Sequence, residues 1–182
     1  KGYDIFGKTI IKILDKYQDW NSVVIGDEPR EKITFKHKNL EVKGYTSHKK
    51  VLKILESVSV SVVCSRWEEP FGRTSLEAAS RGCAVIISNR GGLPETSKSS
   101  IKLKSLSSKN LFMEIEKLIL NKNKLKNYQK KNYNNFIFDH KYISQIIDNI
   151  RKGFVRRKTL NILKPKILKI MHITNFNDRF NG

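Results

Sequence analysis

Two glutamates, Glu69 and Glu77, carry the most informative chemistry in the chain, and seven residues separate them. Glu69 follows an apolar run, and Glu77 falls in the opening turns of the helix predicted next. The free N–H groups at a helix N-terminus favour a phosphate, and an ionised carboxylate beside them accepts hydrogen bonds from hydroxyl groups. A phosphate and a polyol bound together describe a sugar nucleotide. By spacing alone, the simpler explanation is one glutamate that satisfies the helix dipole and a second in solvent.

The segments around these glutamates alternate between strand-like and helix-like patterns, which indicates a parallel sheet covered on both faces. The pattern predicts helices over residues 4–18, 47–57 and 73–81, and strands over 22–25, 40–45, 58–64 and 83–88. This is a doubly wound, Rossmann-like α/β fold, in which ligands bind outside the carboxyl ends of the strands. The loops 26–27, 65–72 and 89–95 each follow a strand, so we expect them to gather at one edge.

The pattern of predicted strands and helices changes after Thr96. A short strand is predicted at residues 101–103, and helical spacing continues from 110 to about 157, which predicts two or three terminal helices packed on the sheet. Pro165 ends this pattern. Residues 167–173 then form a predicted strand with a loop behind it.

The size and composition are those of one ordinary globular domain. The chain has 182 residues, of which 38% are hydrophobic and 29% charged. No apolar run approaches the roughly 18–20 residues that span a bilayer, and the N-terminus lacks the pattern of a signal peptide. The chain starts at Lys1 rather than Met, so we expect the protein to begin further upstream.

The formal net charge is +19, from 36 Lys and Arg against 17 Asp and Glu. Abundant Lys, Asn and Ile favour the plain interpretation, a compositional bias in which lysines fill solvated positions. The main alternative is a basic face that holds a cytoplasmic enzyme against anionic lipid at the inner membrane face. Nucleic-acid binding ranks last, because the aromatic residues mostly occupy apolar helix positions rather than alternating with Lys and Arg.

The cysteines and histidines do not form a metal site or a disulfide framework. Cys64 and Cys83 border apolar runs and are predicted core residues, as suits a reducing cytoplasm. The four histidines occupy positions without ligand spacing, so we expect them on the surface or in the core and not in catalysis.

The residues around the two glutamates resemble the group 1 glycosyltransferases, a large family of retaining enzymes with the GT-B fold. Residues 69–78 match the family's E-x7-E signature, residues 82–86 its G-x-P-V-I strand with Ala84 in place of proline, and residues 91–95 its G-G-x-P-E turn. Upstream, residues 1–2, 24–27 and 40–44 resemble its K-G, V-x-G-D and V-x-F-x-G motifs. The resemblance covers residues 1 to about 157, the C-terminal donor-binding domain of the family.

The resemblance implies a role for each matching residue. Glu77 would hold the ribose hydroxyls of a nucleoside-diphosphate sugar, and Glu69 the hydroxyls of the transferred sugar. Backbone N–H groups would face the sugar and the diphosphate, from Phe71 and Gly72 and from Arg73 and Thr74 respectively. Apart from the resemblance, we expect the backbone and the shape of the loops near 26–27, which include Gly26, and 44–46 to select the base. Arg73 and Thr74 replace an aliphatic pair common in the family, and Arg66 and Trp67 are expected to shape the loop.

The implied chemistry is retaining transfer of a hexose-type sugar to a glycan or lipid-linked acceptor. Lys1 would neutralise the departing diphosphate beside an Arg that the family carries upstream. By resemblance no metal or other cofactor is needed, because cationic groups and the helix dipole stabilise the leaving phosphate. The family's acceptor domain would precede Lys1, so we expect this chain by itself to be inactive in transfer.

Two domain assignments and one alternative function follow. Residues 1–160 are predicted to form the donor-binding domain, lacking its N-terminal part. Residues 161–182 are predicted to form a linker and the first strand of a following acceptor domain, as in a tandem enzyme; a C-terminal extension that packs on the sheet is the alternative. The alternative function is an isolated module that binds a nucleotide sugar without transferring it.

Overall fold

The computed structural model describes residues 2–26, 34–96, 98–137 and 139–159. The described residues divide into two units, one up to Phe136 and one from Ile137, which are treated separately below. Lys1 and the strand predicted at 167–173 lie outside the described residues. Among the residues described, no helix is long and apolar enough to cross a lipid bilayer.

Helices and strands alternate through the first unit, as the sequence pattern predicts. In chain order the elements are α1 (Tyr3–Lys16), β1 (Ser22–Ile25), β2 (Leu40–Lys43), α2 (His48–Leu55), β3 (Val60–Val63), α3 (Arg73–Ser80), β4 (Ala84–Ser88), α4 (Leu93–Thr96), β5 (Ile101–Leu103), α5 (Ser108–Leu120) and α6 (Lys122–Asn134). The second unit contains α7 (His140–Thr159).

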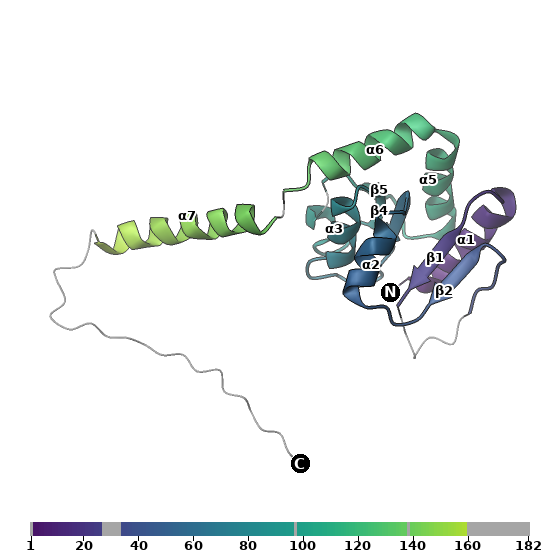
Figure 1. The fold of residues 1–182 in the computed structure, drawn as a ribbon, viewed down its shortest axis with the longest axis horizontal. Helices are drawn as coiled ribbons and strands as arrows, with labels where there is room; N and C mark the ends of the chain where they lie inside the picture. The colour runs from purple at the N-terminus through teal and green to yellow at the C-terminus, as the bar shows by residue number, and fades with distance from the viewer. Residues whose placement is uncertain (1, 27–33, 97, 138, 160–182) are drawn as a thin grey trace, which may run out of the picture. The chain divides into compact units, whose positions relative to one another are not determined.

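The strand pairs that the structure describes are all parallel (Figure 1). β1 pairs with β2, and a second sheet has the order β3–β4–β5. The register places Val60 opposite Ala84 and Val63 opposite Ile87, so β3 and β4 run side by side and end together. Because parallel neighbours share their carboxyl ends, the loops that follow β3 and β4 leave the same edge of the sheet.

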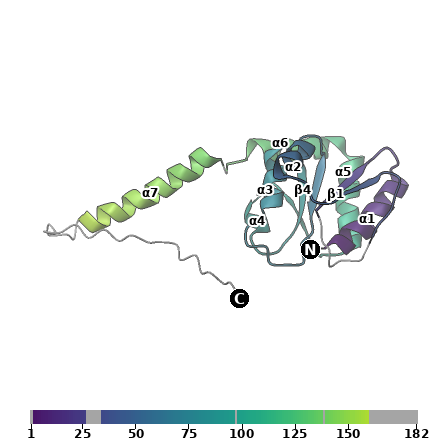
Figure 2. The same ribbon diagram turned by 60° about the horizontal axis from the view of Figure 1, so that its bottom comes forward.

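The central strand β4 is fully buried and separates two apolar cores. Ala84 and Ile86 belong to a core shared with α1, α5 and Leu125 of α6. Val85 and Ile87 belong to a second core, shared with α2, α3 and Leu93 of α4. Figure 2 shows α3 and α4 on one side of β4 and α1 and α5 on the other. Helices therefore cover both faces of this sheet, and the predicted doubly wound α/β fold is confirmed.

Helix α6 lies across the amino ends of the central strands. Gln129 Nε2 donates to the carbonyl of Ser59, just before β3, at 3.3 Å. Asn132 is buried, and its Nδ2 donates to the carbonyl of Cys83, just before β4, at 2.7 Å. This helix occupies the amino edge of the sheet, which leaves the opposite edge to the loops that the sequence predicts as functional.

The second unit presents an amphipathic helix. Apolar side chains of α7 recur at helical spacing, and each is at least one-third exposed: Tyr142, Ile143, Ile146, Ile147, Ile150 and Phe154. The predicted packing of a third terminal helix on the sheet therefore stays a prediction for α7, whereas α5 and α6 contribute to the core beside the sheet.

The predicted elements agree with the structure to within a few residues, with one addition. The Gly/Pro turn predicted at 89–95 contains a single helical turn, α4. The carbonyl of Gly92 accepts from the N–H groups of Glu95 and Thr96 at 3.1 and 3.3 Å. Pro94 suits the first turn of a helix because its missing N–H has no intrahelical partner there.

Candidate functional site

Helix α3 begins in the loop that follows β3. Gly72 caps it in the left-handed conformation, with φ 78° and ψ 50°. A Cβ at Gly72 would lie 2.6 Å from Cδ2 of the buried Leu93, so α4 packs directly against this helix start. Ser75 Oγ and Thr96 Oγ1, both buried, lie 2.8 Å apart and join α3 to α4 again. The start of α3 is therefore held rigidly by the segment after β4.

The first turn of α3 offers backbone donors to an anion. The carbonyl of Gly72 accepts from the N–H groups of Ser75 and Leu76, at 3.1 and 3.3 Å. Helix geometry leaves the N–H groups of Arg73 and Thr74 without an intrahelical acceptor. Both residues are exposed, and the helix dipole adds a partial positive charge there. This end of α3 can accept a phosphate.

Glu69 is half-buried and fixed to the ends of two strands. Its Oε1 accepts from Ser65 Oγ at 3.0 Å, and Ser65 is buried two residues after the end of β3. The carbonyl of Ser65 in turn accepts from the buried Ser88 Oγ, the last residue of β4, at 2.8 Å. The carboxylate of Glu69 is thus held at the carboxyl edge of the sheet, and Ser65 engages one of its two oxygens.

The glycine pair after β4 supports the Glu69 loop. The N–H of Gly92 donates to the carbonyl of Glu69 at 2.7 Å, and the N–H of Gly91 donates to a carboxylate oxygen of Glu68. A Cβ at Gly91 would lie 2.6 Å from the Glu69 nitrogen, and one at Gly92 would lie 2.6 Å from the Pro70 carbonyl oxygen. The two loops therefore touch backbone to backbone, and a side chain at either glycine would separate them.

Glu77 lies one turn further along α3 and meets two cationic or polar partners. Arg73 Nη2 donates to its Oε1 at 3.3 Å, and His48 Nε2 lies 3.0 Å from the same oxygen. The Glu77 side chain is 21% exposed, whereas those of His48 and Arg73 are 57% and 74% exposed. His48 opens α2, so Glu77 is contacted from a second helix as well as from its own.

The start of α1 also reaches the end of β3. Cys64 Sγ lies 3.3 Å from the carbonyl oxygen of Gly2, and a Cβ at Gly2 would lie 1.9 Å from the Cys64 carbonyl oxygen. Arg66 forms an ion pair with Asp4 in the first turn of α1. Hydrogen bonding to this guanidinium lowers the pKa of Asp4 below its ordinary value of 3.8. Arg66 therefore ties the loop to α1, as expected of a residue that shapes it.

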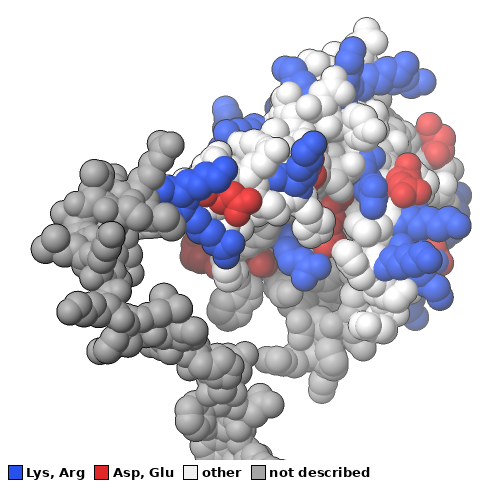
Figure 3. Space-filling view, turned by 60° about the vertical axis from the view of Figure 1, so that its left-hand side comes forward, with Lys and Arg blue, Asp and Glu red and all other residues white. Residues whose placement is uncertain are grey.

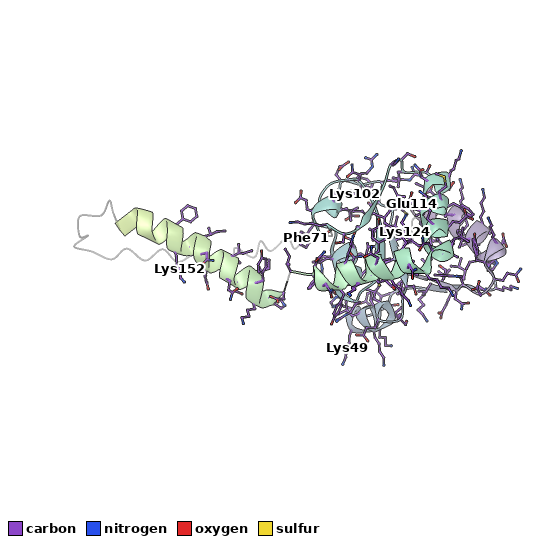
Figure 4. All side chains as sticks on the ribbon, turned by 90° about the horizontal axis from the view of Figure 1, so that it is seen from above. Lys49, Phe71, Lys102, Glu114, Lys124 and Lys152 are labelled. Atoms are coloured by element: carbon purple, nitrogen blue, oxygen red, sulfur yellow. The ribbon has the colours of Figure 1, made fainter. Side chains whose placement is uncertain are left out.

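The remaining predicted site residues are placed less centrally or not described. Gly26 follows β1, and its N–H lies 3.2 Å from the carbonyl oxygen of Lys43 at the end of β2. Phe71 projects from the loop before α3 and is 47% exposed (Figure 4). Lys1 lies outside the described residues. The structure thus gathers Glu69, Phe71, Gly72, Arg73, Thr74 and Glu77 around the start of α3.

Two residues of this region were not predicted from the sequence. His48 was expected to be an ordinary surface or core residue, and Ser65 was not considered. The rule that loops after parallel strands share an edge could have pointed to both, because Ser65 follows β3 closely and His48 starts the helix after β2. Their contacts with the two glutamates join segments far apart in sequence, which motif spacing does not encode.

The lysines and arginines do not form one patch on the face shown in Figure 3. They are spread among uncharged side chains, with Asp and Glu between them. Lys49 of α2 and Lys102 of β5 are exposed and lie on different parts of the first unit (Figure 4). In the part of the chain that the structure describes, no group of three or more His, Cys, Asp and Glu residues could hold a metal ion.

Comparison with known proteins gives a family match. The family model for glycosyl transferases group 1 matches residues 1–135. A curated relative, the 2-deoxystreptamine N-acetyl-D-glucosaminyltransferase of Niallia circulans, is 32% identical over 99 residues. That match covers 50% of this chain and 25% of the enzyme, so the chain spans about a quarter of this relative.

Solved structures agree on the fold. The C-terminal domain of the glycosyl transferase group 1 family protein LpcC from Francisella tularensis superimposes with a TM-score of 0.65 at 26% identity, covering 74% of this chain and 76% of that one. Anabaena Alr3699/HepE, solved in complex with UDP-glucose, gives a TM-score of 0.62 at 17% identity, covering 73% of this chain and 41% of that one. At 17% identity, the similarity to HepE shows a shared fold and nothing more.

Proposed function

Because the chain belongs to the group 1 glycosyl transferases, we propose that its first unit binds the nucleoside-diphosphate sugar from which the whole enzyme transfers a sugar. The observation that carries this proposal is the grouping of two carboxylates around one helix start. Glu69 and Glu77 lie in the loop before α3 and on α3 itself, and the first turn of α3 offers N–H groups to a phosphate. HepE, which shares the fold, was solved with UDP-glucose bound.

The proposal gives each group a task. The N–H groups of Arg73 and Thr74 receive the diphosphate, since the dipole of α3 favours negative charge at that end. Glu77, further along the helix, accepts hydrogen bonds from the ribose hydroxyls. Glu69 accepts hydrogen bonds from hydroxyls of the transferred sugar, and its contact with Ser65 fixes its orientation before the donor arrives.

The reaction we propose is retaining transfer to a glycan or lipid-linked acceptor. Negative charge develops on the departing diphosphate, and the helix N-terminus stabilises it without reorganising. Lys1 would add a full positive charge there. In this proposal, another part of the whole protein binds the acceptor. We therefore expect the 182-residue chain to bind the donor without transferring its sugar.

The proposal is tested by titration calorimetry of the 182-residue chain with UDP, GDP and ADP. We expect one nucleotide to bind and Glu77→Gln to weaken it by about 1.5–3 kcal/mol, the range for hydrogen bonds to a charged group. Glu114→Gln is the matched control, because Glu114 of α5 is 22% exposed against 21% for Glu77, and each pairs with a basic residue on its own helix. Glu114 is labelled in Figure 4.

The outcomes separate the site from the fold. Equal losses in Glu77→Gln and Glu114→Gln would mean that the glutamate acts through general electrostatics, which contradicts the proposed site. A folded chain that binds none of the three nucleotides would also contradict donor binding by this unit. Transfer is tested separately, by supplying labelled nucleotide sugar and acceptor extracts to the longer protein.

A further inference from the structure

The contacts of Glu77 are concentrated on one of its two carboxylate oxygens. His48 Nε2 and Arg73 Nη2 both approach Oε1, at 3.0 and 3.3 Å. A carboxylate has about four lone-pair sites, two on each oxygen. The donors of the protein therefore engage Oε1 and orient the group, and the acceptor sites of Oε2 are the natural ones for a ligand's hydroxyl groups.

We propose that His48 is a positioning residue that aims the carboxylate of Glu77 at the ribose diol and so sets the preference for ribonucleotides over 2′-deoxyribonucleotides. This inference rests on the proposed function, because it assumes that Glu77 meets the ribose. It adds a residue from α2 to a site otherwise built on α3 and its preceding loop. In this arrangement His48 acts through Glu77.

His48 and Arg73 differ in what they can fix. Arg73 lies four residues before Glu77 on the same helix, and its side chain is 74% exposed. Exposed pairs at this spacing are weak, so Arg73 restrains the carboxylate only loosely. His48 belongs to α2, which packs against the core that α3 also lines through Ala78 and Ala79. A hydrogen bond from a separate helix restricts the rotation of the Glu77 side chain in a second direction.

The position of His48 also couples the site to the loop after β2. His48 is the first residue of α2, directly after the N-cap Ser47, and β2 ends at Lys43. This short connection runs from the carboxyl end of β2, so a shift in the loop moves His48 with it. The same loop is one of the segments expected to select the base. Base selection and ribose recognition would then be linked through one side chain.

The test compares two ligands: the nucleoside diphosphate that binds among UDP, GDP and ADP, and its 2′-deoxy analogue. We expect the unmodified chain to prefer the ribonucleotide by about tenfold or more, as befits one hydrogen bond to a charged group. His48→Ala should reduce this preference about 3- to 10-fold, the effect of losing one ordinary hydrogen bond. His48→Gln should recover most of it, because its amide NH₂ can donate to Oε1 in place of Nε2.

Two controls make the result specific. Lys49→Ala alters an exposed neighbour on the same helix and should leave the preference unchanged. In a Glu77→Gln background, His48→Ala should have no further effect, because its route of action is gone. Urea unfolding of each variant checks that the chain still folds with similar stability.

Each outcome is decisive. If Glu77→Gln abolishes the preference while His48→Ala leaves it intact, His48 does not position Glu77, and the proposed donor site stands. A loss that His48→Gln does not recover, or that persists in the Glu77→Gln background, overturns the positioning role in favour of a general effect on α2. If Glu77→Gln itself changes nothing, the ribose contact is wrong and the inference falls with it.

Discussion

Alanine at Gly92 should separate the two loops that build the site, and three other glycines of the chain calibrate the effect. Gly92 has an ordinary φ, but a Cβ there would lie 2.6 Å from the Pro70 carbonyl oxygen. Gly91 combines such contacts with a left-handed φ of 51°. Gly26 has a φ of 124° with no atom of the described residues within 4 Å of its Cβ position, and Gly44 likewise has no described atom within 4 Å and no positive φ. The four positions thus separate crowding from backbone strain.

The magnitudes follow from those two effects. Crowding backbone against backbone costs about 1–3 kcal/mol of folding free energy, which is the expectation for Gly92→Ala. A strained left-handed alanine costs about 1–3 kcal/mol, which applies to Gly26→Ala. Gly91→Ala incurs both and should lose about 2–6 kcal/mol. Gly44→Ala should change stability by at most about 1 kcal/mol, since it mainly lowers the entropy of the unfolded chain.

Urea unfolding followed by circular dichroism measures the series. At a slope of about 2 kcal/mol per molar urea, a loss of 2 kcal/mol lowers the midpoint by about 1 M. Nucleotide affinity should also fall in Gly92→Ala relative to the unmodified chain, because Gly92 contacts the loop that carries Glu69. If Gly92→Ala proves as stable as Gly44→Ala and binds nucleotide as well as the unmodified chain does, the close contact of the two loops does not hold the site, and this reasoning is refuted.

Three further predictions concern charge and reactivity. Arg66→Gln should lower the free energy of unfolding at pH 7 by less than about 1 kcal/mol. Because the pKa of Asp4 is depressed in the folded chain, this difference is present above pH 3.8, the ordinary pKa of Asp, and shrinks as the pH falls below 3.8. Urea unfolding at pH 7 and at pH 3 measures it. Burial raises the pKa of Cys64 and Cys83 to about 11, so both thiols should resist a chromogenic disulfide reagent at pH 8 until urea unfolds the chain. If basic side chains hold the protein on anionic lipid, it should sediment with vesicles containing phosphatidylserine and be released by 0.5 M salt; equal binding to neutral vesicles would contradict this.

The sheet and its helices could be predicted because their signals are local. Residues 83–87 form a continuous apolar run, typical of a strand covered on both faces, and β4 is such a strand. The short strand predicted at 101–103 matches β5, where Ile101 and Leu103 are buried and Lys102 is exposed. Apolar residues at alternating or helical spacing report on burial directly, so each element could be placed without knowing its neighbours.

The contacts within the site could be predicted only in part, because they join segments distant in sequence. The grouping of Glu69 and Glu77 at one helix start follows from local spacing. In the structure, Glu69 lies in the loop before α3 and Glu77 lies within α3. The engagement of Glu77 by His48, 29 residues earlier, depends on how α2 and α3 pack in three dimensions. Likewise, the single turn of α4 forms where Leu93 fills the core beside Gly72, a tertiary effect that a Gly/Pro-rich stretch does not reveal.

The motifs divide into residues that we propose contact the ligand and residues that support them. Gly91 and Gly92 face the backbone of the Glu69 loop, and the hydroxyl groups of Ser75 and Thr96 are buried against each other, so these four act on position. The carboxylate of Glu77, in contrast, keeps part of its surface in solvent. Changes at the supporting residues should therefore lower stability and affinity together. Changes at Glu77 should lower nucleotide affinity while the urea midpoint of unfolding stays nearly constant. The ion pairs that such changes remove are partly exposed to solvent, and such pairs contribute little to the free energy of unfolding.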